Sequence, residues 1–221
     1  SPLQNSLLWV YEGQTQYYGQ VIAARSGLLT TQQAMDSLAM TAATFDTRVG
    51  REWRAMQDTT NDPIISQRQA KGWLSWQRDE DYYSEGQLIW LDVDTLIREK
   101  TNGRKSLDDF ARAFYGVQDG DYSPAPYTFE DVVAALNGVV ANDWATFLRT
   151  RLDADGPEAR APLDGLARGG WRLAYSDKPT DYMKTLYAEL KRNDFTYSLG
   201  FQTGDSNKIR SVQWGSPAFK A

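Results

Sequence analysis

The sequence contains neither histidine nor cysteine in its 221 residues. Without histidine, the chain lacks the commonest zinc ligand and the usual general base near neutral pH. Without cysteine, it can form neither disulfides nor thiolate metal sites, and the redox compartment cannot be read from it. The two absences together exclude a metal site built from imidazole or thiolate groups of this chain.

Long apolar runs and basic clusters are also missing. No apolar run reaches the ~18 residues of a membrane-spanning helix, and no signal peptide is visible. The net charge is −5, and no basic patch of the nucleic-acid-binding type stands out. We therefore predict no membrane span in this chain and no nucleic-acid partner. Aromatic residues are plentiful, with eight Trp and twelve Tyr, and the length suits one large domain or one and a half smaller ones.

The stretch 7–25 has the apolar spacing of a helix. Its predicted buried face comprises Leu7, Val10, Tyr11, Tyr17, Tyr18, Val21 and Ile22. Glu12 lies about 200° from Val10 on a wheel of ~100° per residue, so its carboxylate leaves that face. Gly13 and Gly19 interrupt the helix, which suggests that another group approaches the backbone closely. From the residues alone, Glu12 is a metal ligand, a general base or a partly solvated surface glutamate.

Further helices follow along the chain. They are predicted over 32–45 after a cap at Thr30 or Thr31, from Asp81 to the Asn102-Gly103 stop, after a capping box at Ser106, from Thr128, from Asp143 to about Arg151, and after Thr180. The irregular, tryptophan-rich stretch 48–80 is either a wall of a substrate cleft or a structural loop pinned by its tryptophans. The segment 153–170 is typical of a domain edge, and 171–175 alternates like a short strand.

The pattern changes to a period of two near the C-terminal end. Strands are predicted over 195–201 and 208–214, with a turn at 204–207. Two strands and a turn of helix cannot bury a core of their own. We therefore expect them to lean on the helical part or on the strand edge of another chain.

The run Trp9-Val10-Tyr11-Glu12-Gly13, followed by Thr15 and Tyr18, resembles the W-x-x-E-G-x-T-x-Y element of gluzincin metallopeptidases, and in particular the glycyl aminopeptidase family, relatives of aminopeptidase N. The resemblance implies that Glu12 is the third protein ligand of a catalytic zinc. In that family the other two ligands come from an earlier His-Glu-x-x-His helix, which this sequence lacks together with its general base. We therefore expect the later part of such an enzyme, with no zinc at the catalytic site of this chain alone.

The run Tyr83-Ser84-Glu85-Gly86 resembles the Y-x-K-G element of aminopeptidase N relatives. There the tyrosine donates a hydrogen bond to the oxyanion of the tetrahedral intermediate, and a rigid phenol suits that role. Tyr83 occupies the matching position, whereas Tyr82 does not fit the spacing and Glu85 replaces the family's lysine. Without the resemblance, Tyr83 would be interpreted as a tyrosine packed at a helix start with its hydroxyl in water.

The run Ser198-Leu199-Gly200-Phe201 resembles the carboxylate-binding loop of a PDZ domain, and Gly215-Ser216-Pro217-Ala218 resembles the bacterial PDZ element that begins a short helix. The resemblance implies that Leu199, Gly200 and Phe201 bind a C-terminal peptide through converging backbone N–H groups and β-addition. The other interpretation of these residues is a plain hairpin.

The residues and the resemblance predict a mainly α fold. It is the helical half of a thermolysin-like (gluzincin) catalytic domain, followed by a small β segment that resembles a partial PDZ domain. The predicted parts are the helical catalytic part at 1–170, a connecting strand and helix at 171–193, and the PDZ-like part at 194–221.

The predicted function is that of a fragment of a zinc metallo-aminopeptidase, which hydrolyses N-terminal peptide bonds when complete and is inactive as this chain. Its partners are a peptide substrate and a C-terminal peptide at the PDZ-like segment. The alternative is a non-enzymatic helical module with a peptide-binding hairpin. Relatives with this layout are often exported in bacteria, so a periplasmic or secreted protein is expected, with the cytoplasm as the other location.

Overall fold

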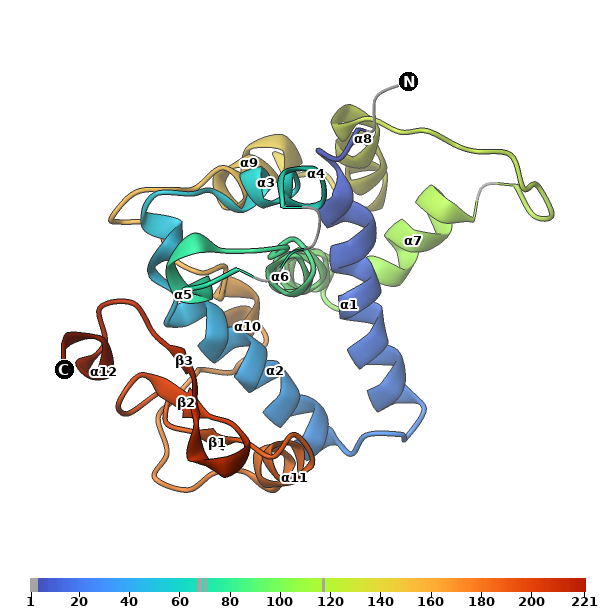
Figure 1. Cartoon of the computed structure of the whole chain (residues 1–221). Coiled ribbons are helices and arrows are strands. Elements are labelled where there is room, and N and C mark those ends of the chain that lie inside the picture. The colour runs from blue at the N-terminus through green and yellow to red at the C-terminus, as the bar shows by residue number, and fades with distance from the viewer. Residues whose placement is uncertain (1–3, 67–68, 70, 117) are drawn as a thin grey trace.

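Helix α6 (Ser84–Thr101) lies at the centre of the protein (Figure 1). Its apolar residues are buried around more than one side, as its sequence predicts: Leu88, Ile89, Trp90, Val93 and Ile97 are fully buried. The helix ends at Asn102 in the left-handed conformation (φ 51°), and Gly103 follows with φ 75°. The predicted Asn-Gly stop is thus confirmed.

The computed structural model describes residues 4–66, 69, 71–116 and 118–221. Before α6 the chain forms α1 (Leu8–Arg25), α2 (Thr31–Asp46), η1 (Val49–Glu52), α3 (Met56–Thr59), α4 (Asp62–Ile65) and α5 (Leu74–Gln77). After α6 come α7 (Leu107–Tyr115), α8 (Phe129–Val139), α9 (Trp144–Leu152), α10 (Asp164–Arg168) and α11 (Asp181–Glu189). The last elements are β1 (Asn193–Asp194), β2 (Phe201–Thr203), η2 (Asp205–Asn207), β3 (Ile209–Val212) and α12 (Pro217–Lys220). The mainly α prediction is confirmed.

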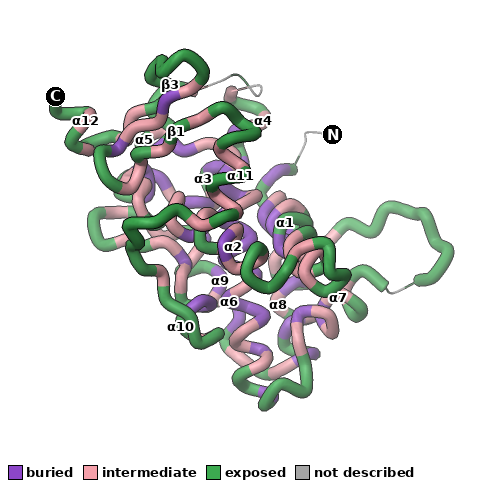
Figure 2. Tube along the Cα trace, turned by 90° about the horizontal axis from the view of Figure 1, so that it is seen from below, coloured by how far each residue is buried: buried purple, intermediate pink, exposed green. Residues whose placement is uncertain are grey.

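Two apolar clusters surround α6. The larger cluster packs α1, α7, α8 and α9 about it, and its fully buried aromatic rings are Trp9, Trp90, Phe110 and Trp144. The smaller cluster joins α2 and α10 to the opposite part of α6 through Ala42, Phe45, Leu88 and Leu166. Burial is concentrated along α6 and the inner parts of its neighbours, whereas residues 118–126, between α7 and α8, are exposed (Figure 2).

The predicted buried face of α1 is partly wrong. Trp9, Val10 and Tyr17 are buried, but Tyr11 is 56% exposed and Ile22 is 57% exposed. The reason is the crossing of the two long helices: Figure 1 looks down the axis of α6, while α1 lies across the view. A helix that crosses at a steep angle covers a short patch of its partner, centred here on Gly13, instead of a stripe along its whole length.

Short-range side-chain caps begin several helices, as the sequence predicts. Thr30 and Gln33 form a capping box at α2, and Ser106 and Asp109 form one at α7. The Thr180 side chain accepts the N–H of Met183 at the start of α11. These bonds satisfy helix N–H groups that lack a partner within the helix.

The stretch 153–175 is tied to α6. A Cβ on Gly165 of α10 would lie 2.7 Å from the backbone nitrogen of Asp92, so the two backbones are in direct contact. The Asp92 carboxylate is fully buried and pairs with Arg151 and Arg168. The strand predicted at 171–175 is wrong, because this segment carries no ladder bonds to a partner strand.

The C-terminal sheet has the order β1-β2-β3, with both pairs antiparallel. The predicted strand at 208–214 is confirmed by β3, and the turn at 204–207 by η2. The strand predicted at 195–201 is wrong over 196–200, which form a turn. The turn forms because the Phe195 carbonyl accepts the N–H groups of Leu199 (2.9 Å) and Gly200 (2.8 Å).

The sheet leans on the helical part, as expected. The Trp214 N–H donates to Ser75 Oγ at 2.8 Å, and the Trp214 ring stacks on Trp76 with centroids 5.1 Å apart.

Within the described ranges, every helix is too short or too polar to traverse a lipid bilayer.

Candidate functional site

The neighbourhoods of Glu12 and Tyr83 meet where α1 crosses α6. A Cβ on Gly13 would lie 2.9 Å from the carbonyl carbon of Gly86 and 3.0 Å from its Cα, so only glycine permits this approach. Glu12 precedes Gly13, and Tyr83 lies about one turn before Gly86 on α6. The close approach predicted at Gly13 is confirmed. At Gly19 the prediction is wrong, since no atom of the described chain comes within 4 Å of its Cβ position.

A pair of buried tryptophans holds the crossing in place. The rings of Trp9 and Trp90 stack with centroids 5.6 Å apart and an interplanar angle of 21°. Trp90 Nε1 donates to the Trp9 carbonyl at 3.0 Å. Both side chains are fully buried, so the backbone beside Glu12 is rigidly placed relative to the start of α6.

Glu12 is a half-buried carboxylate on α1. In the part of the chain that the structure describes, it forms neither a hydrogen bond nor an ion pair. Most other half-buried or buried acidic groups near α6 are paired with arginine. Glu12 is therefore available to an external cation or donor.

Tyr83 is the residue from which α6 begins (φ −72°, ψ −74°). Its ring lies 4.8 Å from that of Tyr82, measured between centroids, and it is half-buried against the main core. It also lines a cavity of about 540 Å³ that lies between the start of α6, α2 and α11. A phenol group at the edge of a cavity can donate to a bound molecule.

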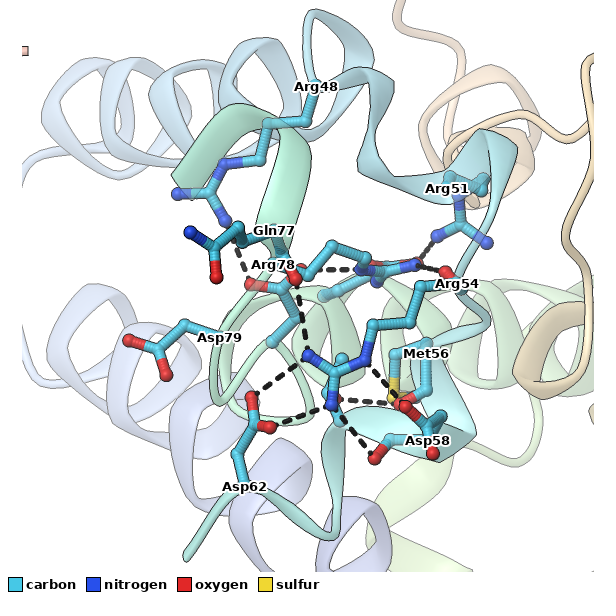
Figure 3. A network of polar contacts seen from close by, with 12 residues as sticks. Arg48, Arg51, Arg54, Met56, Asp58, Asp62, Gln77, Arg78 and Asp79 are labelled. Atoms are coloured by element: carbon cyan, nitrogen blue, oxygen red, sulfur yellow. Dashed lines mark hydrogen bonds and ion pairs between the residues drawn. The ribbon is translucent and has the colours of Figure 1, made fainter. Parts of the chain in front are cut away.

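The backbone around Tyr83 is held by a buried charge network (Figure 3). Glu85, two residues after Tyr83, is fully buried and forms ion pairs with Arg51 and Arg78. Asp81, two residues before Tyr83, accepts from Arg78 Nε at 2.8 Å and from Arg48 Nη1 at 2.8 Å. Arg78 therefore anchors the chain on both sides of Tyr83. This role explains the glutamate at position 85, where the resembled motif has lysine.

The same network organises the stretch 48–80. Arg54 binds Asp62 (2.7 Å) and Asp58 (2.6 Å), and Lys71 also binds the buried Asp62 (2.6 Å). Among the described residues of the network, five cations face five carboxylates: Arg48, Arg51, Arg54, Lys71 and Arg78 against Asp58, Asp62, Asp79, Asp81 and Glu85. Among the described residues of this stretch, the buried side chains are thus charged or polar apart from Met56, while its tryptophans lie at the surface.

Arg78 combines this network with backbone strain. Its φ of 60° and ψ of 167° belong to a region that is costly for any residue other than glycine. Burial lowers the pKa of Arg78, and the charge of Asp81 opposes that effect. A strained residue persists only where its surroundings overdetermine it, and three partners do so here: Asp81, Glu85 and the Arg54 carbonyl. Sequence reasoning assigned these arginines no role; their only local signal was the regular spacing of Arg48, Arg51 and Arg54.

A zinc site does not arise from the described residues. They contain no cluster of three or more His, Cys, Asp or Glu side chains arranged to hold a metal ion. Glu12 can supply one anionic donor, and a catalytic zinc normally has three protein ligands and a water. The described residues can therefore supply one zinc ligand, Glu12, but not the other protein ligands that a catalytic zinc site requires.

The PDZ-like loop is closed on itself. The N–H groups of Ser198, Leu199 and Gly200 converge on one oxygen, the Phe195 carbonyl, at 3.2, 2.9 and 2.8 Å. Gly200 has φ 85°, and a Cβ there would lie 2.1 Å from Ser216 Cβ. The following strand, β2, which starts at Phe201, is paired on both edges. Peptide binding at Leu199, Gly200 and Phe201 stays a prediction. It requires the N–H groups of the loop to release the Phe195 carbonyl and to bind the peptide carboxylate instead.

Comparison with protein families links the first part of the chain to peptidases. Residues 1–89 match the family model of the M61 glycyl aminopeptidases. No curated protein matches the chain. The matched region contains α1 with Glu12, the charge network and the start of α6 with Tyr83, and it supports a peptidase family for this part of the chain. It does not include α7 to α12.

Proposed function

We propose that this chain is the later, helical part of a zinc-dependent aminopeptidase domain, with Glu12 as a zinc ligand and Tyr83 as the oxyanion donor. The observation that carries the proposal is the crossing of α1 and α6. It brings together the surroundings of two residues that belong to separate motifs, and both lie in the matched region 1–89.

Glu12 suits a ligand role because it is half-buried, rigidly placed and unpaired within the described chain. When bound, zinc polarises the peptide carbonyl and lowers the pKa of a coordinated water. The remaining protein ligands have to come from residues other than those described. Glu12 contributes one negative charge, and the neighbouring Trp9–Trp90 pair prevents its helix from shifting.

The outer face of α1 supports the idea that another segment covers it. Tyr11, Thr15, Gly19 and Ile22 recur at helical spacing and are all exposed. Apolar side chains on an exposed helical stripe, with an uncovered glycine between them, are typical of a surface that packs against a further element. In our proposal this element carries the histidine ligands next to Glu12.

Tyr83 would donate its hydroxyl proton to the oxyanion that forms when the peptide carbonyl is attacked. The donor must be fixed before the reaction, because a preorganised group loses no reorganisation energy in the transition state. The anchoring of Asp81 and Glu85 by Arg78 meets that requirement for the backbone of Tyr83. Removing one such donor lowers kcat by roughly 10²–10³.

The test uses the natural protein that carries this chain and measures hydrolysis of aminoacyl 4-nitroanilides. Tyr83→Phe should lower kcat about 100-fold or more, whereas Tyr82→Phe, which alters an adjacent stacked ring, should leave kcat within about twofold. Reading the coding sequence upstream of the Ser1 codon should also reveal His-Glu-x-x-His. If the wild type is active and the two tyrosine variants have the same kcat, Tyr83 has no role in the reaction. A gene that does not encode His-Glu-x-x-His would exclude Glu12 as a zinc ligand.

A second candidate function is peptide binding by the C-terminal hairpin. The N–H groups of Ser198, Leu199 and Gly200 converge on the Phe195 carbonyl oxygen, and a peptide carboxylate would bind them by replacing that oxygen as their acceptor. A fluorescent peptide with a free C-terminal carboxylate should then bind more tightly than the same peptide with a C-terminal amide. Equal affinity of the two peptides would reject this function. Export to the periplasm or medium stays a prediction from the resemblance.

A further inference from the structure

The cavity beside Tyr83 has the dimensions of a ligand site. Its volume of about 540 Å³ falls within the ~300–1,000 Å³ range that is common for small-molecule pockets. It is far larger than a glycine residue requires. Three parts of the chain form it: α2, the segment leading into α6, and α11.

Apolar side chains supply the walls of the cavity. Met40 and Phe45 come from α2, Leu74 from α5, and Tyr182 and Leu186 from α11. The two residues of α11 lie outside the region 1–89 that matches the glycyl aminopeptidase model. The wall that α11 forms opposite α2 therefore lies outside the region that matches the family model.

Several polar groups of the lining are already engaged within the protein. The Thr44 hydroxyl donates to the Met40 carbonyl at 2.8 Å, and the Thr41 hydroxyl donates to the Ser37 carbonyl at 3.3 Å. Asp79 pairs with Lys71 at 3.4 Å. Groups that are satisfied within the protein offer little to a polar ligand, so recognition depends on apolar contact.

Arg48 and Asp81 are engaged as well. The Arg48 guanidinium lies 5.0 Å above the Phe45 ring and binds Asp81, which Arg78 also holds. Arg48, Asp79 and Asp81 are therefore neutralised by charged partners within the protein, and the apolar side chains of the lining remain for contact with a bound molecule.

We propose that this cavity holds the side chain of the substrate's N-terminal residue, and that it selects bulky, uncharged side chains in addition to glycine. The inference rests on the proposed function, because Tyr83 both lines the cavity and would contact the scissile carbonyl. The N-terminal residue adjoins that carbonyl, so its side chain enters the space next to the phenol ring.

The activity test fills the cavity in the natural protein. Leu186→Trp should lower kcat/KM for phenylalanyl and leucyl 4-nitroanilide about 10- to 100-fold, while the glycyl substrate changes less than about threefold. Ala188→Trp places a tryptophan at an exposed position of α11 and should leave kcat/KM for all three substrates unchanged. A protein that cleaves none of these substrates would reject the proposed function. If the wild type is active but Leu186→Trp changes kcat/KM equally for all three substrates, the inference is overturned while the proposed function stands.

A binding measurement tests the cavity without catalysis. The 221-residue chain with ¹³C-labelled methionine methyl groups would be titrated with L-phenylalaninamide or with glycinamide. The Met40 signal should shift in a saturable manner with phenylalaninamide and not with glycinamide, and Leu186→Trp should abolish the shift. An unshifted Met40 signal in the wild-type chain, or equal shifts with the two amides, would overturn the inference.

Discussion

Substituting glycine by alanine at two positions of the same helix separates helix propensity from helix packing. Alanine is favoured over glycine in a helix by roughly 1 kcal/mol. At Gly19 the new methyl group meets nothing within 4 Å, so Gly19→Ala should stabilise the chain by about that amount. At Gly13 the methyl group would lie 2.9 Å from a backbone carbon of Gly86 and 3.0 Å from Trp90 Cδ1.

The clash at Gly13 cannot be relieved by rotating a flexible side chain, because it involves backbone atoms of Gly86 and the buried ring of Trp90, which is stacked on Trp9. Overpacking of this kind costs about 1–3 kcal/mol. Since the propensity gain is the same at both positions, the difference between Gly13→Ala and Gly19→Ala isolates the clash. We expect Gly13→Ala to be less stable than Gly19→Ala by about 1–3 kcal/mol.

Urea unfolding followed by tryptophan fluorescence measures this difference, and the chain has eight tryptophans to report it. The m-value should be equal in both variants if the unfolded states are alike. Equal stabilisation by the two substitutions would refute the close crossing of α1 and α6. The proposal that the crossing brings the segments of Glu12 and Tyr83 together would then have no structural support.

Three further predictions concern the network, the hairpin and one helix cap. Glu85→Gln should lower the free energy of unfolding by about 3–5 kcal/mol, because it removes the carboxylate that pairs with the buried Arg51 and leaves Arg78 with Asp81 as its carboxylate partner. Asp58→Asn should cost less than about 1 kcal/mol, because the Asp58 carboxylate is 53% exposed, and similar losses for the two variants in urea unfolding would contradict a buried network. A double-mutant cycle of Trp76→Ala and Trp214→Ala should give a coupling of about 0.5–1.5 kcal/mol, and no coupling would mean that the hairpin does not dock on the helical part. Hydrogen bonds from the Thr128 backbone N–H and hydroxyl lower the pKa of Asp131. The contribution of Asp131 to the free energy of unfolding is therefore present above the unfolded-state pKa of about 3.9 and is lost as the pH falls through the folded-state pKa. The stability difference between wild type and Asp131→Asn should therefore shrink below about pH 4, and a difference that is independent of pH would exclude the cap.

Features that depend on near neighbours in the sequence could be predicted from it. The caps at Thr30, Ser106 and Thr180 each use a donor within three residues. The start of α6 and its buried character followed from a dense apolar run. In each case the partner lies in the same local segment, so spacing alone is enough.

Features that depend on distant partners could not be predicted. Arg48 and Asp81 are 33 positions apart, and nothing in either segment indicates the pairing. The exposed side chains Tyr11 and Ile22 follow from the steep crossing of α1 over α6, which periodicity cannot give. The segment 196–200 alternates like a strand, but the Phe195 carbonyl closes it into a turn.

The candidate site, too, could be predicted from the sequence only in part. The residues alone left Glu12 open between a ligand, a base and a solvated glutamate, and only the resemblance to a peptidase motif selected the first. The structure adds that Glu12 is half-buried and unpaired among the described residues and precedes Gly13, where the backbones of α1 and α6 approach each other. It also adds the buried arginines that hold the chain on either side of Tyr83.

Zinc content measures the central claim most directly. The natural protein that carries this chain, its Glu12→Gln variant and a Glu130→Gln control at an exposed helix position would be dialysed without chelator and analysed for metal per chain. Our account predicts a single zinc in the wild type and the control, and its loss in Glu12→Gln. Zinc retained in full by a folded Glu12→Gln variant would contradict the assignment of Glu12 as a metal ligand.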